Sequence, residues 1–241
     1  MPGPVQIAPS VREAFEWTPI SHRVSAMVDA YDEVRDRLRD LTGGMQTALL
    51  AVSGTLANDI AGACLRERFG DRTGIVLSNG EFGERLIRQA ESAGLKFTSL
   101  SSRWGQPWNQ RGIEQAMERG ASWIWGVHLE TSTGHLNDLK WLTERAHGLQ
   151  IAVAADCVSS LGAVPLDGLG LHFATGVSGK AFGAYAGIAL IFVEEDMLKK
   201  ICFKRMPSYS IFAQAFASAN RCSPAVTAAA GINRSLEKPL S

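Results

Sequence analysis

The 241-residue chain has few cysteines, no excess of charge and no long apolar run. Its four cysteines, Cys64, Cys157, Cys202 and Cys222, show no C-x-x-C spacing, which argues against a zinc site and a disulfide framework. The 24 basic and 24 acidic residues cancel, so no surface for nucleic acid or an anionic membrane is expected. The first residues, MPGPVQIAPS, lack a signal-peptide pattern, and no run could span a bilayer. We therefore expect a cytoplasmic protein without a metal, nucleic-acid or membrane partner.

Two common catalytic motifs are also missing. A P-loop requires G-x-x-x-x-G-K-[ST], but Ala174 and Ala181 occupy the two outer required positions. A nucleophile elbow, G-x-S-x-G, fails because Lys180 stands where its last glycine should be. The chain also contains no internal repeat and no low-complexity linker. A P-loop nucleotidase and a serine hydrolase of the elbow type are therefore excluded.

Segments with strand and helix patterns alternate along most of the chain. After a Pro- and Gly-rich arm over 1–23, apolar residues at helical spacing predict a helix over 24–41 that ends at Gly43-Gly44. Further helices are predicted from Ser53 onward and over 84–93, 111–119, 137–148 and 225–236, with strands over 47–52, 73–78, 97–101, 122–128, 151–155, 171–177 and 187–193. This alternation predicts an α/β fold, a three-layer sandwich with a mostly parallel central sheet. Residues 24–241 are assigned to one large domain.

An acid and a lysine follow two neighbouring predicted strands. Asp156 ends the apolar run 151–155, and Lys180 lies 24 residues later in a small-residue loop after the run 171–177. Ligands of open α/β sheets bind at the carboxyl ends of the strands. This pair suggests pyridoxal phosphate, with Lys180 forming a Schiff base and Asp156 holding the pyridinium nitrogen protonated. The alternative is a solvent-facing lysine and an aspartate that caps a helix.

A second candidate feature is the start of the helix that follows the strand over 47–52. Ser53, Gly54 and Thr55 place two hydroxyls and the first backbone N–H groups of a helix together, which suits a phosphate. The alternative is an ordinary Ser/Thr N-cap. The tripeptide leaves both readings open.

Seven short motifs, in order, resemble the class V aminotransferases, which belong to the fold-type I pyridoxal-phosphate enzymes. The likeness is strongest to the 2-aminoethylphosphonate–pyruvate transaminases and to the alanine–glyoxylate or serine–pyruvate aminotransferases. The matching pieces are PGP at 2–4, SHR at 21–23, SGT at 53–55, NGEFGERL at 79–86, ETSTG at 130–134, DCVSSLGAVPLD at 156–167 and SGK at 178–180. Each tripeptide alone is a weak signal, but their shared order over nearly all of residues 2–193 is a strong one.

The resemblance implies roles for the central residues. Lys180 corresponds to the Schiff-base lysine, which also moves the proton between the substrate Cα and the cofactor. Asp156 corresponds to the partner of the pyridinium nitrogen. Ser53, Gly54 and Thr55 correspond to the phosphate-binding residues at a helix N-terminus. The implied fold is the large domain of the fold-type I transferases.

The resemblance also implies supporting residues. Phe82 would stack on the pyridine ring, Thr131 would hydrogen-bond the ring hydroxyl, and Glu130 would brace that loop. Taken alone, Phe82 could be a core residue and Thr131 a helix cap. Ser178 belongs to the lysine motif and is counted with the cofactor-binding residues. Relatives complete the phosphate site from a neighbouring subunit, so a homodimer is expected, with Ser223 as the candidate for the contact across subunits.

The chain also departs from the family pattern. Gly179 stands where relatives often carry a Gln or Asn that helps to hold the phosphate, and the loop after the lysine reads AFGAYAG in place of a Pro-rich sequence. The small C-terminal domain of relatives, of roughly a hundred residues, is expected to be absent or truncated. That domain carries the arginine that grips the substrate carboxylate. The arginines after Lys180, namely Arg205, Arg221 and Arg234, match no such context.

The resemblance implies a pyridoxal-phosphate-dependent aminotransferase that moves an amino group between a small amino donor and an oxo acid or aldehyde. One alternative is another reaction of the same cofactor, such as elimination, decarboxylation or carbon–carbon bond formation. Another alternative is a cofactor-poor partner subunit. Bleaching of the cofactor by an amino donor separates the first two hypotheses, and failure of Lys180 to form the adduct supports the third.

Overall fold

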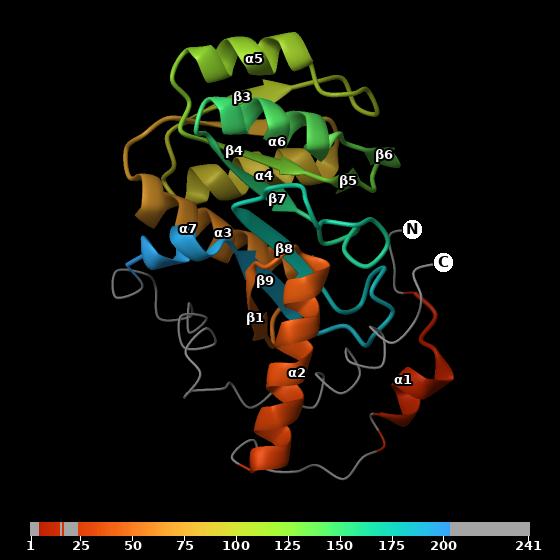
Figure 1. Cartoon of the computed structure of the whole chain (residues 1–241). Coiled ribbons are helices and arrows are strands. Elements are labelled where there is room, and N and C mark those ends of the chain that lie inside the picture. Colours follow the sequence, from red (N-terminus) through yellow and green to blue (C-terminus); the bar gives the residue numbers. More distant parts are fainter. Residues whose placement is uncertain (1–4, 15, 17–23, 203–241) are drawn as a thin grey trace.

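A computed structural model describes residues 5–14, 16 and 24–202 of the chain (Figure 1). A seven-stranded sheet forms its centre, in the order β1-β9-β8-β7-β4-β2-β3. Its strands are β1 (Gln46–Leu50), β2 (Gly74–Ser78), β3 (Phe97–Ser101), β4 (Trp123–Val127), β7 (Ala152–Asp156), β8 (Phe173–Val177) and β9 (Ala189–Val193). A small separate ladder joins β5 (Leu129–Glu130) to β6 (His135–Leu136).

Most strands of the central sheet run in one direction. The pairs β2–β3, β2–β4, β4–β7 and β7–β8 are parallel. Strand β9 is antiparallel to both of its neighbours, β8 and β1, so β1 points the same way as β8. The prediction of a mostly parallel sheet is therefore confirmed.

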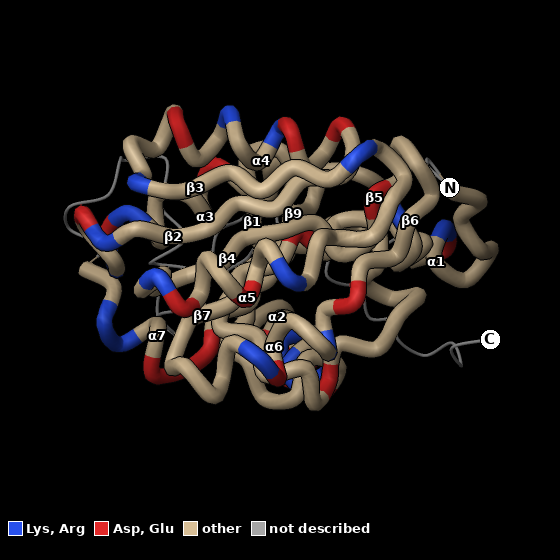
Figure 2. Tube along the Cα trace, turned by 90° about the horizontal axis from the view of Figure 1, so that it is seen from above, with Lys and Arg blue, Asp and Glu red and all other residues tan. Residues whose placement is uncertain are grey.

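Helices cover both faces of the sheet. They are α1 (Pro9–Glu13), α2 (Ser25–Leu41), α3 (Gly54–Phe69), α4 (Glu81–Ser92), α5 (Gln110–Glu118), α6 (Leu139–Gly148) and α7 (Glu195–Lys199). Apolar residues of α2, α5 and α6 share one buried cluster with the sheet, and those of α3, α4 and α7 share another. Seen from above, α4 lies on one side of the strands and α6 on the other (Figure 2). The predicted three-layer sandwich is confirmed.

The inner strands read as continuous apolar runs because helices bury both of their faces. Every residue of β4 (WIWGV) and of β7 (AVAAD) is buried. Strand β3 (FTSLS), at the edge of the sheet, has no buried residue and carries polar side chains instead. The sequence pattern therefore follows the position of each strand in the sheet.

The observed elements differ from the predicted ones in three places. The arm over 1–23, predicted to be irregular, contains the short helix α1, in which Pro9 takes a position that needs no N–H donor and Val11 is fully buried. Helix α4 begins at Glu81, earlier than the predicted start at residue 84. The β5–β6 ladder was not predicted. The helix predicted over 225–236 lies outside the described residues.

Within residues 5–14, 16 and 24–202, no helix is both long enough and apolar enough to cross a membrane.

Candidate active site

The candidate site is a cavity of about 390 Å³ at the carboxyl ends of the parallel strands. Val127, Asp156 and Val177, the last residues of β4, β7 and β8, all line it. Six of the residues predicted from the sequence line the same cavity: Ser53, Gly54, Thr55, Phe82, Asp156 and Lys180. The fold therefore brings together side chains from four separate stretches of the chain. This is the edge at which ligands of open α/β sheets bind.

Asp156 is held firmly at the end of β7. Its side chain is buried, with 5% of the residue exposed. Oδ1 accepts a hydrogen bond from the Val158 N–H at 2.9 Å, and Oδ2 accepts one from the Asn58 amide at 2.7 Å. Burial raises the pKa of the Asp156 carboxyl above its usual value of 3.8, and the two hydrogen bonds offset part of that rise. Both oxygens are thus oriented before any ligand binds.

Asn58 is a site residue that the sequence analysis missed. It lies on the buried face of α3, lines the cavity and accepts a hydrogen bond from the Thr175 hydroxyl at 2.6 Å. That bond fixes the amide so that its NH₂ group points at Asp156. The signal in the sequence is a polar residue between Ala57 and Ile60 on an apolar helix face, since buried amides require partners.

The start of α3 is compatible with both interpretations of the Ser53-Gly54-Thr55 segment, as a helix N-cap and as a phosphate-binding site. Ser53 is the N-cap, and its hydroxyl accepts a hydrogen bond from the Leu56 N–H at 3.3 Å. The first N–H groups of a helix have no acceptor within their own helix, so they remain available to an anion. A Cβ added to Gly54 would lie 2.9 Å from a methyl of Val177. Glycine therefore lets the helix start approach the end of β8.

The loop between β8 and β9 carries the candidate lysine. Lys180 and Gly179 line the cavity. The Ser178 hydroxyl is buried, donates to the Tyr185 carbonyl at 2.6 Å and accepts from the Ile188 N–H at 3.3 Å. Ser178 is not among the residues that line the cavity, and its hydroxyl braces the loop. Its assignment to cofactor binding stays a prediction.

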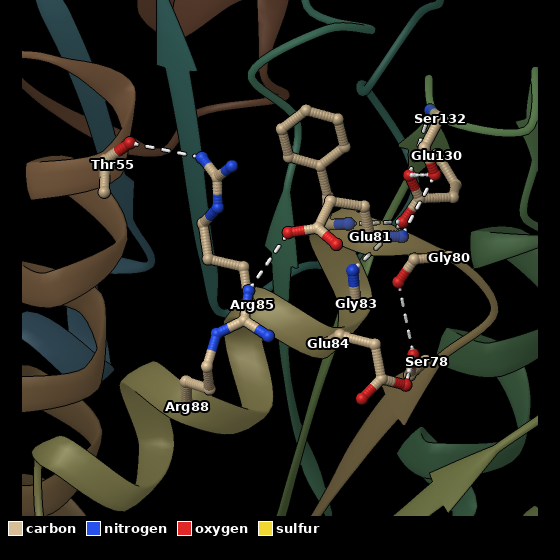
Figure 3. A network of polar contacts seen from close by, with 11 residues as sticks. Thr55, Ser78, Gly80, Glu81, Gly83, Glu84, Arg85, Arg88, Glu130 and Ser132 are labelled. Carbon is tan, nitrogen blue, oxygen red and sulfur yellow. Dashed lines mark hydrogen bonds and ion pairs between the residues drawn. The ribbon is translucent and has the colours of Figure 1, made fainter.

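Glu130 ties the start of α4, which carries Phe82, to the β5–β6 loop, which carries Thr131. The Glu130 carboxylate is fully buried, and its Oε2 accepts hydrogen bonds of 3.0 Å from the N–H groups of Phe82 and Gly83. Its Oε1 accepts from the Ser132 N–H at 3.1 Å and from the Ser132 hydroxyl at 2.6 Å (Figure 3). This carboxylate at the N-terminus of α4 explains why the helix begins at Glu81.

Thr131 contributes a polar group that the described residues leave unused. Its Oγ1 is buried and has no hydrogen-bond partner within the described part of the chain. Thr131 does not line the cavity itself, although Leu129, two residues before it, does. A buried hydroxyl without a partner is costly unless a ligand satisfies it. The prediction that Thr131 contacts a ring hydroxyl is not tested, but it is compatible with a Thr131 hydroxyl that has no other partner among the described residues.

Arg85 is the second site residue that the sequence analysis left without a role. It lines the cavity, and its guanidinium lies 3.5 Å from Oγ1 of Thr55 and 4.9 Å from the centre of the Phe82 ring. The signal in the sequence is its spacing, since residues three apart on a helix share a face, and Arg85 follows Phe82 by three.

A sheet covered on both faces, with a lysine, a buried acid and a helix N-terminus at its carboxyl edge, defines the large domain of a fold-type I pyridoxal-phosphate enzyme. The chain belongs to the class V aminotransferase family: the family model described as Aminotransferase class-V matches residues 17–237. Pyridoxal phosphate is the cofactor of that family.

Proteins named as aminotransferases, and proteins named as hydrogenase subunits, are among those similar to this chain. The chain is 32% identical over 218 residues to the soluble hydrogenase 42 kDa subunit of Anabaena cylindrica, covering 87% of this chain and 56% of that protein. It is 29% identical to a 2-aminoethylphosphonate–pyruvate transaminase of Pseudomonas fluorescens, covering 72% and 51%. The structure of a subgroup IV aspartate aminotransferase from Thermus thermophilus superposes with a TM-score of 0.87 at 26% identity, covering 98% of this chain and 68% of that one. The chain spans about half the length of the curated relatives it matches.

The residues of the cavity fit this cofactor. Asp156 offers an oriented carboxyl, Lys180 an amine, and the start of α3 a set of anion-binding N–H groups. The Thr131 hydroxyl, which does not line the cavity, has no hydrogen-bond partner among the described residues. Ser223, the candidate contact from a second subunit, lies outside the described residues, so that prediction is not tested.

Proposed function

We propose that this protein is a pyridoxal-phosphate-dependent aminotransferase that moves an amino group between a small amino donor and an oxo acid or aldehyde. The observation that supports this most is one cavity shared by Lys180, Asp156 and the N-terminus of α3. These are the three groups that anchor an aldehyde, a pyridine nitrogen and a phosphate. Their separations in sequence make a chance meeting improbable.

The cofactor, when bound, supplies an electron sink that stabilises negative charge at the substrate Cα. In our proposal Lys180 anchors the cofactor aldehyde and then moves a proton between the substrate Cα and the cofactor. Asp156 holds a proton on the pyridine nitrogen. Asn58 and the Val158 N–H keep the Asp156 carboxyl in place for that contact.

The remaining residues position the ring. Phe82 lines the cavity and would stack on one ring face, while Thr131 would contact the ring hydroxyl. Both depend on Glu130, which bonds the backbone of Phe82 directly and braces the loop that begins at Thr131. Ser53, Gly54 and Thr55 would bind the phosphate.

The test is a visible spectrum of the purified protein with pyridoxal phosphate, followed by borohydride reduction and peptide mapping. We expect a yellow, reducible adduct on Lys180 that is absent in Lys180→Ala. Lys140→Ala, on the exposed surface of α6, is the matched control and should keep the adduct. A Lys180→Ala protein that still carried a reducible adduct would refute the assignment of the lysine.

We also propose that the protein is a cytoplasmic homodimer in which Ser223 reaches the phosphate site of the other subunit. Sedimentation velocity of the loaded protein should give twice the chain mass of 26.0 kDa. Ser223→Ala should then weaken cofactor binding without changing that mass. A monomer that binds the cofactor tightly would contradict the shared site.

A second candidate function is a subunit of a larger assembly. Two relatives at 32% identity are named as subunits of soluble hydrogenases, and this favours it. Amino donors distinguish the two candidates, because an aminotransferase should lose its yellow colour with a donor and regain it with an oxo acid. A protein that binds the cofactor but is bleached by no donor would favour the second candidate, or another reaction of the same cofactor.

A further inference from the structure

Arg85 is a cation of the cavity to which neither the family likeness nor the proposed mechanism gives a role. Among the described residues that line the cavity, only Arg85 and Lys180 carry a basic side chain. Lys180 is committed to the aldehyde in the proposed function. The cavity therefore offers one guanidinium to any further anionic group of its ligand.

The acidic neighbours of Arg85 on α4 have other partners. Glu81, four residues before it, pairs with Arg88 at 3.1 Å, and Glu84 accepts a hydrogen bond from the Ser78 hydroxyl at 2.6 Å (Figure 3). A pair between Glu81 and Arg85 would have had the usual helical spacing. In the part of the chain that the structure describes, Arg85 forms no ion pair with a carboxylate of its own helix.

Arg85 points across to the start of α3. Its guanidinium contacts Oγ1 of Thr55 at 3.5 Å, and Figure 3 shows the side chain extended from α4 toward that residue. Thr55 is the second residue of α3, so this contact places the guanidinium beside the first N–H groups of the helix. A side-chain cation and a helix N-terminus thus meet at one place, and both attract anions.

Position 179, in the loop that carries the lysine, offers no side-chain donor. Gly179, the residue before the lysine, lines the cavity but has no side chain, and a Cβ there would lie 2.7 Å from the Cα of Ala186. A phosphate monoester carries about −1.5 to −2 charges near pH 7. A helix N-terminus contributes an equivalent of only about half a positive charge. A full cation beside the helix start therefore brings the charge of the site close to that of the phosphate.

We propose that Arg85 binds the cofactor phosphate together with the N-terminus of α3, in the role of the side chain that position 179 lacks. This inference rests on the proposed function. Arg85 is then a binding residue for the phosphate, and the substrate's own anionic group is held elsewhere. Because guanidinium and phosphate form two parallel hydrogen bonds, lysine replaces arginine only in part.

The test compares pyridoxal phosphate with pyridoxal, which lacks the phosphate, in titrations of the adduct absorbance of the full chain. Loss of one charged hydrogen-bonding partner predicts a roughly 10- to 100-fold higher Kd for pyridoxal phosphate in Arg85→Met. The Kd for pyridoxal should change by less than about twofold. Arg88→Met is the matched control, one turn further along α4 and outside the cavity, and both of its Kd values should stay at the wild-type level. Arg85→Lys should lie between the wild type and Arg85→Met.

Circular dichroism of each variant checks its folding, and Arg85→Lys decides the outcome if Arg85→Met does not fold. Equal losses of affinity for both aldehydes would overturn the proposal, because a phosphate contact cannot weaken pyridoxal. An unchanged Kd for pyridoxal phosphate with a raised KM for the amino donor would overturn it too, since Arg85 would then bind substrate. A wild-type chain that forms an adduct with neither aldehyde would overturn the proposed function itself, and this inference with it.

Discussion

Replacing Glu130 by glutamine tests whether one buried carboxylate holds the start of α4 against the β5–β6 loop. Glu130 is fully buried, and its two oxygens accept four hydrogen bonds, two from the backbone of Phe82 and Gly83 and two from Ser132. Glutamine has nearly the same shape but replaces one acceptor oxygen with an NH₂ group. If the NH₂ group faces α4, the Phe82 and Gly83 N–H groups both lose their acceptor. If it faces Ser132, the Ser132 N–H loses its acceptor, whereas the Ser132 hydroxyl can turn and accept from the amide.

The expected cost follows from the less costly orientation, in which one N–H loses its acceptor. A hydrogen bond to a charged group contributes about 1.5 to 3 kcal/mol net. The total stability of a domain is about 5 to 15 kcal/mol, so a loss of this size should clearly lower the urea midpoint of Glu130→Gln. The N-terminus of α4 should also fray, since it loses a negative charge.

The assay is urea unfolding of the cofactor-free protein, followed by tryptophan fluorescence, to which the fully buried Trp123 and Trp125 contribute. Glu84→Gln is the control, because Glu84 also lies in the first turn of α4 and glutamine can still accept from the Ser78 hydroxyl. We expect a loss below about 1 kcal/mol for the control. Amide hydrogen exchange should quicken at Phe82 and Gly83 only in Glu130→Gln. Equal, small losses for both variants would refute the reasoning.

Three further perturbations test other parts of the structure. Burial lowers the pKa of His128 to about 4, so the folded state prefers the neutral ring. The folded protein therefore loses about 3 kcal/mol of stability as the pH falls from 6.5 to about 4, and none of it above pH 6.5. Urea unfolding of His128→Gln across that range should lack this slope, and a wild-type slope would contradict it. In Gly83→Ala the new Cβ would lie 2.6 Å from the backbone of β2, so the variant should lose about 1 to 3 kcal/mol of folding stability. The control Gly148→Ala, in open space on α6, should lose none. Equal melting temperatures for the two variants would refute this. Asn58→Leu removes a donor from the Asp156 carboxylate and should raise its pKa further in a carbon-13 NMR titration, and a lowered pKa would count against the assigned contact.

The layers of the fold could be predicted from the sequence because each strand carries the pattern of its surroundings. The runs that became β4 and β7 are apolar throughout, since helices cover both faces. The same reasoning placed Asp156 and Lys180 at strand ends, and the structure puts both on one cavity. The reversed direction of β9 has no such signature, because a strand buried on both faces reads the same in either direction.

The rest of the site depends on contacts between distant segments, which periodicity does not reveal. Asn58 meets Asp156 across 98 residues of sequence, and Arg85 meets Thr55 across 30. Local pattern also does not show which hydroxyl is already engaged: the Ser178 hydroxyl bonds its own loop, while that of Thr131 has no partner among the described residues. The early start of α4 depends on a carboxylate from another strand.

Because β9 runs antiparallel to β8, the loop that carries Lys180 can change in length without altering the sheet. A parallel neighbour would require a crossover of a dozen or more residues, and any change in it would move a covering helix. Here the chain leaves β8 at Val177 and returns at Ala189, with the Ser178 N–H bonded to the Ile188 carbonyl at 2.9 Å. Insertions and deletions between these two residues can reshape the surroundings of Lys180 while the sheet keeps its register. This segment is therefore the place where sequence changes can alter the surroundings of Lys180 at the least cost to the sheet.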